Sequence, residues 1–143
     1  MAPNPNFGIK NDEVVSVRLP VAASQTIYHN DPLTLGTGGV ARAAAGDKIF
    51  GYAIHAVTSG STAGVTFLEV DVSPSTLRRF KTDGTVSLAA HLFHKCDFGG
   101  YASDGTPQID YNSATNGDLK IVAVDVTAQT VLCLTVPVFT AVS

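Results

Sequence analysis

Apolar and polar residues alternate in short segments along most of the chain, which is the pattern of β-strands with one buried face. In residues 13–19, for example, Val15, Val17 and Leu19 fall on one face. Strong turn signals separate these segments: Asn30-Asp31-Pro32, Gly38-Gly39, Gly46-Asp47, Ser59-Gly60, Asp83-Gly84, Asp104-Gly105 and Asn116-Gly117-Asp118. The spacing predicts an all-β fold, either a β-sandwich or a β-barrel-like unit. A helix fits only residues 86–93, which read equally well as a strand.

A weak internal repeat predicts two similar small β-modules related by tandem duplication. The segment Ile27-Tyr-His-Asn-Asp-Pro-Leu33 aligns with Leu92-Phe-His-Lys-Cys-Asp-Phe98, and a Gly-Asp step precedes a long strand in both halves. Chance similarity between strands rich in Val and Thr is the alternative explanation. With duplication, we expect an extended N-terminal arm over residues 1–12, a first β-module over 13–75 and a second over 76–143.

The alternation also predicts which side chains face inward in each half. Leu68 aligns with Leu134 on the inner face, and Ile54 belongs to the inner face of its own strand. Phe67 and Cys133 then fall on the outer face although both are apolar. Such an outer face is covered either by a second sheet or by another subunit, and we favour a subunit interface.

Composition narrows the class of protein further. Only 15% of the 143 residues are charged and the net charge is −3, which excludes a coiled coil, a disordered acidic tail and a basic nucleic-acid binder. The longest apolar stretch, residues 131–142, contains Pro137 and is too short for a membrane span. No signal peptide is visible, and two cysteines make no disulfide framework. We therefore expect synthesis in a reducing cytoplasm, no membrane partner and free thiols at Cys96 and Cys133, with a single disulfide between them as the alternative.

No cluster of residues predicts catalysis. Four residues have metal-like spacing, His91, His94, Cys96 and Asp97, but a zinc site would need a further histidine from elsewhere in the chain. A nucleophile elbow and a phosphate-binding loop are both missing from the sequence. We expect a protein that acts by binding, with no catalytic residue, no cofactor and no metal.

The single basic cluster is Arg78-Arg79-Phe80-Lys81. It predicts a contact with an acidic protein surface or, alternatively, a solvated strand edge protected from mispairing. It is too small for a nucleic-acid site. The first half of the chain is slightly basic and the second half acidic, so copies could associate head to tail or around a ring.

The stretch Val40–Val70 resembles a known group of virion proteins. Its succession of Gly46-Asp47, Gly51-Tyr-Ala-Ile54, Gly64 and Phe67-Leu-Glu-Val70 is similar to that of capsid decoration (cement) and head-fibre proteins of tailed bacteriophages, and the second half echoes it. The resemblance implies a non-enzymatic structural protein on the virion surface. It implies the major capsid protein as partner, a homo-oligomer with a trimer favoured, and stabilisation of the head against the pressure of packaged DNA.

The residues expected to contact the capsid lie in the arm and in the basic cluster: Asn4, Phe7, Ile9, Lys10, Arg78, Arg79 and Lys81. The arm is expected to lie across neighbouring capsid subunits and to add a strand to an exposed edge. The alternative function is a receptor- or carbohydrate-binding β-module of a phage fibre. That class uses exposed aromatic residues, whereas this chain has no Trp, and only Tyr101 and Tyr111 fall in predicted loops.

Overall fold

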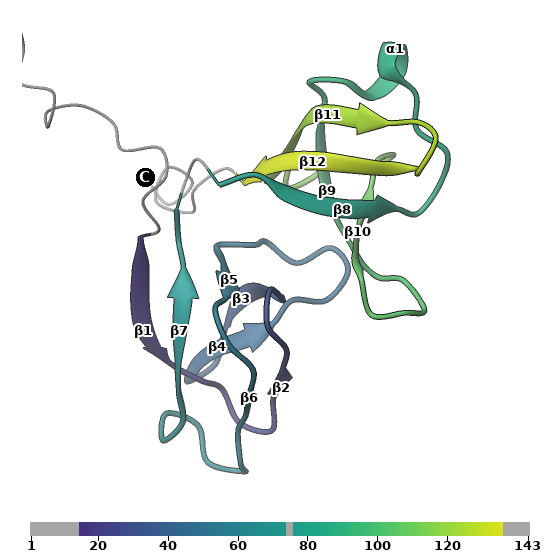
Figure 1. Ribbon diagram of the computed structural model, residues 1–143. Helices are drawn as coiled ribbons and strands as arrows, with labels where there is room; N and C mark the ends of the chain where they lie inside the picture. Colours follow the sequence, from purple (N-terminus) through teal and green to yellow (C-terminus); the bar gives the residue numbers. More distant parts are fainter. Residues whose placement is uncertain (1–14, 74–75, 136–143) are drawn as a thin grey trace, which may run out of the picture.

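The computed structural model describes residues 15–73 and 76–135, and it confirms the predicted all-β fold (Figure 1). The N-terminal unit contains β1 (Ser16–Pro20), β2 (Thr26–Ile27), β3 (Pro32–Gly36), β4 (Gly39–Arg42), β5 (Gly51–Ala53), β6 (Val57–Thr58) and β7 (Phe67–Asp71). The C-terminal barrel contains β8 (Arg78–Thr82), α1 (Leu88–His91), β9 (Lys95–Tyr101), β10 (Pro107–Asp110), β11 (Leu119–Asp125) and β12 (Thr130–Thr135). The predicted module boundary at 75/76 lies between β7 and β8. The predicted arm and its contact residues Asn4, Phe7, Ile9 and Lys10 lie outside the described residues.

Both units have the same strand order. In the N-terminal unit the order is β1-β7-β5-β3-β4, and a parallel bridge between Val21 and Val40 connects the two outer strands. In the C-terminal barrel the order is β8-β12-β11-β9-β10, and parallel pairing of β10 with β8 closes the ring. The first strand of each unit therefore pairs with the last one, and all other pairings within the two rings are antiparallel. This correspondence supports a tandem duplication, which remains a prediction.

One glycine is required where the N-terminal unit closes. Gly39 begins β4 with φ at 156°, and a Cβ atom there would lie 2.4 Å from the carbonyl oxygen of Pro20. The end of β1 can approach β4 this closely only because the position has no side chain. The predicted turn signal at Gly38-Gly39 thus marks both the β3–β4 hairpin and the close contact between β1 and β4.

The two units share one of the two hydrophobic cores. A smaller cluster within the N-terminal unit includes Leu33, Leu68 and Val70. The larger cluster fills the C-terminal barrel around Phe80 and Phe98, and it also takes in side chains of the N-terminal unit: Ala43, Ile49 and Tyr52. Burial of these apolar side chains in a neighbouring barrel removes their surface from water and so joins the two units.

The short helix α1 occupies the one segment where the sequence allowed either a helix or a strand. Ser87 caps the helix, because its side chain accepts a hydrogen bond from the backbone N–H of Ala90. The helix ends at His91, and Leu92 is again extended. In the described part of the chain, no helix has the length and apolar character that spanning a bilayer requires.

The predicted inner and outer faces are correct for β7 and wrong for β12. Leu68 is buried and Phe67 is exposed, as expected, but Cys133 is also fully buried and belongs to the core of the barrel. The predicted alignment of Leu134 in β12 with Leu68 in β7 is therefore wrong by an odd number of residues. The prediction for Ile54 is also wrong, since this side chain is 37% exposed. The inner position here is Ala53, which pairs with the buried Val70 of β7, so Ile54 falls on the opposite face.

Candidate functional site

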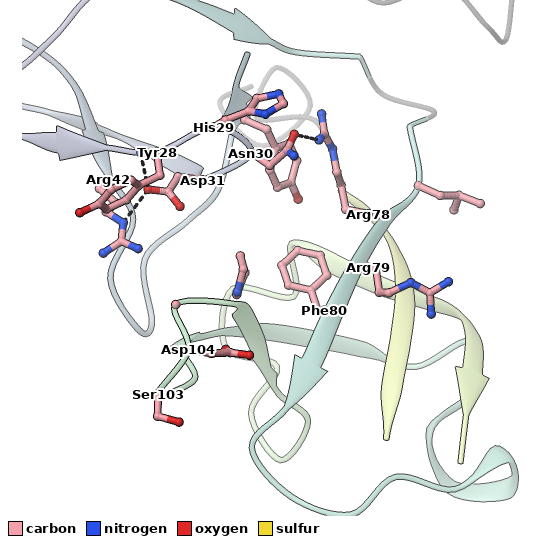
Figure 2. A pocket seen from close by; sticks show the side chains of 14 residues that line it. Tyr28, His29, Asn30, Asp31, Arg42, Arg78, Arg79, Phe80, Ser103 and Asp104 are labelled. Atoms are coloured by element: carbon pink, nitrogen blue, oxygen red, sulfur yellow. Dashed lines mark hydrogen bonds and ion pairs between the residues drawn. The ribbon is translucent and has the colours of Figure 1, made fainter. Parts of the chain in front are cut away.

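A cleft of about 850 Å³ lies between the two units (Figure 2). One wall comes from the segment before β3 and from the end of β4, with Tyr28, Asn30 and Arg42. The other wall comes from β8 and from the loop between β9 and β10, with Arg79 and Asp104. Its volume lies within the range of small-molecule and peptide sites.

A tight turn fixes the N-terminal wall. Asn30 adopts a left-handed conformation with φ at 70°, which places Asp31 so that its Oδ2 accepts a hydrogen bond from the backbone N–H of Tyr28 at 2.8 Å. The same oxygen accepts from Nε of Arg42 at 2.6 Å. The Arg42 guanidinium also lies 3.7 Å from the ring centre of Tyr101 and 5.3 Å from that of Tyr28. Arg42 is thus held by an ion pair and by cation–π contacts.

Arg78 connects the two units at the inner end of the cleft. Its Nη2 lies 2.5 Å from Oδ2 of Asp71, and its Nη1 donates to Oδ1 of Asn30 at 3.0 Å. The guanidinium stands 4.4 Å from the ring centre of Tyr52, whose hydroxyl group hydrogen-bonds Thr135. Burial raises the pKa of Tyr52, so this residue stays neutral. Arg78 therefore lies in the contact between the units.

Arg79 and Lys81 lie on the opposite face of β8 from Phe80, because side chains alternate along a strand. Arg79 is exposed and donates to Oγ1 of Thr130 at 3.2 Å. Lys81 lies 2.5 Å from Oδ2 of Asp104, and this hydrogen bond lowers the pKa of that carboxyl group. Of the predicted basic residues, Arg78 and Arg79 line the cleft, and Lys81 is connected to it through Asp104.

Arg42, Tyr28 and Asp31 were not predicted as site residues. The turn signal Asn30-Asp31-Pro32 correctly marked the loop but said nothing about a guanidinium from a different strand. Tyr28 is 57% exposed, whereas Tyr101, predicted to lie in a loop, belongs to β9 and is half-buried. The exposed aromatic residue of the cleft is therefore one that the sequence did not single out.

The structure separates the residues with metal-like spacing. Cys96 points into the barrel core, and the Nδ1 atom of His91 accepts from the N–H of Ser87. Asp97 anchors a loop instead: it accepts from the hydroxyl group of Ser113 and from three backbone N–H groups between residues 115 and 117. Burial opposes ionisation of Asp97, but these hydrogen bonds outweigh it and lower its pKa. Among the described residues, no group of His, Cys, Asp and Glu side chains could hold a metal ion.

The two thiols are free and buried next to each other in the C-terminal barrel. The hydrogen bond with Cys96 and burial both raise the pKa of Cys133. A thiol with a raised pKa is a poor nucleophile, because the thiolate is the reactive form. These residues therefore act as small core side chains.

The cleft can bind a ligand through guanidinium groups, an amide, carboxylates and one exposed phenol ring. His29 also lines it, but within the described residues it makes no hydrogen bond to a hydroxyl group, a thiol or a carboxylate, which a nucleophile–base pair would need. Comparisons with protein-family models, with curated proteins and with solved structures found no match to this chain. The functional argument therefore depends on the geometry and on the resemblance of residues 40–70.

Proposed function

We propose that the protein is a virion structural protein that binds the outer surface of the major capsid shell of a tailed bacteriophage and stabilises the head. The resemblance of residues 40–70 to capsid decoration proteins is one support. The other support is the surface of the N-terminal unit, where exposed apolar side chains and an arginine are available for contact with a partner protein. In this proposal the protein acts as a homo-oligomer, with a trimer favoured, and without catalysis.

One observation carries the proposal: an exposed apolar patch on the outer face of the N-terminal unit. We call it the outer patch and define it by Ile54, Phe67 and Arg18. Phe67 is 42% exposed and Ile54 is 37% exposed. The N–H of Ile54 donates to the carbonyl oxygen of Glu69, so Ile54 lies beside β7 on the face that also carries Phe67. The guanidinium of Arg18 stands 4.9 Å from the Phe67 ring centre.

The outer patch has the composition of a protein–protein contact. Interfaces are enriched in aromatic residues and Arg, and apolar residues that gather on an exposed face mark interaction sites. A single patch of this size supports only weak binding. On a symmetric shell, however, an oligomer engages several sites at once, so that the effective affinity greatly exceeds that of one contact.

The test is co-sedimentation with expanded phage heads that lack the protein. The double variant Ile54→Ser/Phe67→Ser is expected to lower head occupancy at least about tenfold, since the apolar contact area is lost. Val126→Ser is the matched control, because it removes an apolar side chain that is 49% exposed on the other unit, in the turn after β11. Undiminished occupancy of the double variant, or an equal loss with Val126→Ser, would contradict the proposal.

A second measurement addresses the predicted arm and the oligomer. Deletion of residues 1–12 is expected to reduce head occupancy and to leave the thermal unfolding of the described strands unchanged. Sedimentation equilibrium of the intact chain is expected to show an oligomer. A monomer at all salt concentrations would remove the avidity on which head binding depends in this proposal.

A further inference from the structure

We propose that the C-terminal segment, residues 136–143, adds as a further strand to an open edge of β1 in its own chain. The segment lies outside the described residues, and we define the open edge by the backbone groups of Ser16 and Arg18. The proposal does not depend on capsid binding, because it concerns how the N-terminal unit is completed. Both the backbone and the side chains of β1 lack partners at this edge.

The first half of β1 has a neighbouring strand on one side only. β1 pairs along its whole length with β7, and on its other side it is bonded to β4 only around the bridge between Val21 and Val40 (Figure 1). Because this bridge lies beyond the C-terminal end of β1, residues 16–19 have no strand on that side within the described part of the chain. An unpaired strand edge is a template for a further strand.

The hydrogen bonds to β7 show which backbone groups of β1 are free. Along an antiparallel strand, residues alternately direct their N–H and C=O groups toward the partner strand and away from it. The N–H of Val21 donates to the residue before β7 at 2.8 Å, and the carbonyl oxygen of Val15 accepts from the residue after β7 at 2.9 Å. Odd-numbered residues of β1 therefore face β7. The N–H groups of Ser16 and Arg18 face the open edge, and neither has a hydrogen-bond partner among the described residues.

The inner face of β1 is uncovered at the same place. Val17 lies opposite Val70 of β7, so the two side chains share a face, and Val70 is fully buried in the N-terminal core. Val17 is nevertheless 39% exposed and Val15 is 51% exposed, whereas Leu19, further along β1, packs against the core. The core of the N-terminal unit is thus open beside the unpaired part of β1. A further apolar strand would remove this surface from water.

The C-terminal segment has a suitable composition and starting point. Five of its eight residues are apolar and none has a charged side chain, and its Val and Phe residues are typical of strands. It follows Thr135, which lines a small pocket together with Val72 and Ser73, just after β7. The side chain of Ser73 accepts the N–H of Val15 at 2.8 Å. The segment therefore begins at the end of β1 where the edge is open.

The segment is also long enough. Passing the ends of two strands takes about 10 Å, or about three extended residues of roughly 3.3 Å each. About five residues remain to pair with the five residues of β1, and the added strand would run parallel to β1. Pro137 falls in the crossing, where its missing N–H removes no ladder hydrogen bond. The other segment that adjoins β1, residues 1–12, contains two prolines and three asparagines, which disfavour a strand.

Hydrogen exchange of single amides, followed by NMR on the ¹⁵N-labelled full-length protein, tests the proposal. The N–H groups of Ser16 and Arg18 are expected to exchange at least about tenfold more slowly than in a variant that lacks residues 136–143. The N–H of Val17 faces β7 and is the internal control, which is expected to change less. Deletion of residues 1–12 is the matched deletion and is expected to leave these rates unchanged. The proposal is wrong if the C-terminal deletion leaves Ser16 and Arg18 unchanged, if Val17 accelerates equally, or if the N-terminal deletion has the same effect.

Full-length variants keep the proposal testable if the shortened chain does not fold. Val138→Asp/Val142→Asp places two charges on one face of the segment, because residues four apart lie on the same face of a strand. It is expected to accelerate exchange at Ser16 and Arg18 as the deletion does. Val138→Ile/Val142→Ile keeps that face apolar and is the matched control. Unchanged exchange in the Asp variant, or an equal effect of the Ile variant, would overturn the proposal.

A pair of substitutions at one position tests the edge itself. Arg18→Pro removes the N–H at the open edge and leaves the hydrogen bonds between β1 and β7 in place, since this N–H faces away from β7. It is expected to release the C-terminal segment, so that chymotrypsin cleaves after Phe139 at least about fivefold faster than in the native protein. Arg18→Ala loses the same side chain but keeps the N–H, and we expect native cleavage rates. Equal cleavage of the two variants would contradict pairing at this edge.

A mixing experiment identifies the chain that supplies the strand. Unlabelled intact protein is added to ¹⁵N-labelled protein that lacks residues 136–143. Docking within one chain predicts that the labelled N–H groups of Ser16 and Arg18 continue to exchange rapidly. If their exchange becomes slow, a second copy supplies the strand, and docking within the chain is wrong.

Discussion

The two units follow the same path of strands but bury different kinds of residues. The C-terminal barrel closes through a parallel pair of strands and packs Phe80 and Phe98 at its centre. The N-terminal unit closes through a single bridge between Val21 and Val40 and has a smaller, mainly aliphatic core. The first unit contributes side chains to the core of the second and keeps apolar residues on its own surface, such as Phe67.

This difference shows that two units with the same strand order can differ in which of their faces are buried and which are exposed. The backbone ladders are alike in the two units, and the turns and the alternation of each sequence are compatible with the same strand order. Which face is covered depends on the individual side chains. The C-terminal barrel has the interior of a stable domain, whereas the N-terminal unit combines a contact to its neighbour with an exposed face available for partners.

The largest expected effect comes from breaking the core that the units share. Tyr52→Ala removes a buried ring of the N-terminal unit from the C-terminal core and is expected to lower the free energy of unfolding by about 3–5 kcal/mol. Calorimetry is expected to show one transition at lower temperature, because both units lose the contact. Tyr52→Phe keeps the ring and loses the hydrogen bond to Thr135, at a cost of about 1 kcal/mol. Two separate transitions would show that the units unfold independently.

A second test concerns Asp97, the carboxylate that anchors a loop of the C-terminal barrel. Asp97→Asn removes the charge that accepts four hydrogen bonds in the C-terminal barrel and is expected to lower stability at pH 7 by about 2–3 kcal/mol. Because the pKa of Asp97 is lowered in the folded state, its contribution is present above the ordinary Asp pKa. That contribution is lost as pH falls through the folded pKa. Urea unfolding of both proteins at pH 7 and pH 3 should show the difference shrinking in acid.

A third test concerns the weaker closure of the N-terminal unit. Gly39→Ala places a methyl group against the carbonyl oxygen of Pro20 and is expected to lower stability by at least about 2 kcal/mol. Gly105→Ala is the matched change in the C-terminal barrel, since Gly105 also has positive φ but has free space around it. Only backbone strain of about 1 kcal/mol is expected there. Equal shifts of the thermal midpoint would mean that the contact with Pro20 is not restrictive.

The smallest effect is expected at Asp118, whose Oδ2 accepts from the N–H of Ile49 across the contact between the units at 2.6 Å. Its Oδ1 is buried and has no hydrogen-bond partner in the described structure. Burial raises the pKa of Asp118, so its ionisation destabilises the fold as pH rises above the ordinary Asp range. Asp118→Asn keeps an acceptor for Ile49 and is expected to be more stable than the native protein at pH 7 by up to about 1 kcal/mol. Urea unfolding at pH 4 should show that this advantage is lost, whereas a pH-independent difference would contradict the explanation.

The sequence was sufficient to predict the all-β fold, since its alternation and turn signals are local properties. It also identified residues 86–93 as the one segment that could be helical, where Ser87 supplies a cap. It failed in β12, because Val131, Leu132, Cys133 and Leu134 are all apolar and alternation cannot distinguish the two faces. An irregularity of register between Ile121 and Ala123 in the neighbouring strand added to this ambiguity.

The candidate site was predicted only in part, and for a physical reason. Arg78 and Arg79 could be identified because adjacent cations form a local pattern. Arg42 acquires its role through Asp31 and Tyr101, which are contacts between strands and between units. Single-sequence patterns carry no information on such long-range contacts. Arg78 was predicted to contact a partner, but it connects the two units instead, through hydrogen bonds from its two terminal nitrogen atoms to Asn30 and Asp71.

The shared core also has a consequence for the order of events during protein synthesis. The hydroxyl group of Tyr52 bonds a residue 83 positions further along the chain. The N-terminal unit therefore leaves the ribosome well before the strands that cover Tyr52 and Ile49 exist. Until β12 has been translated, this apolar surface has no partner in the chain, and the nascent protein is most exposed to aggregation in that interval.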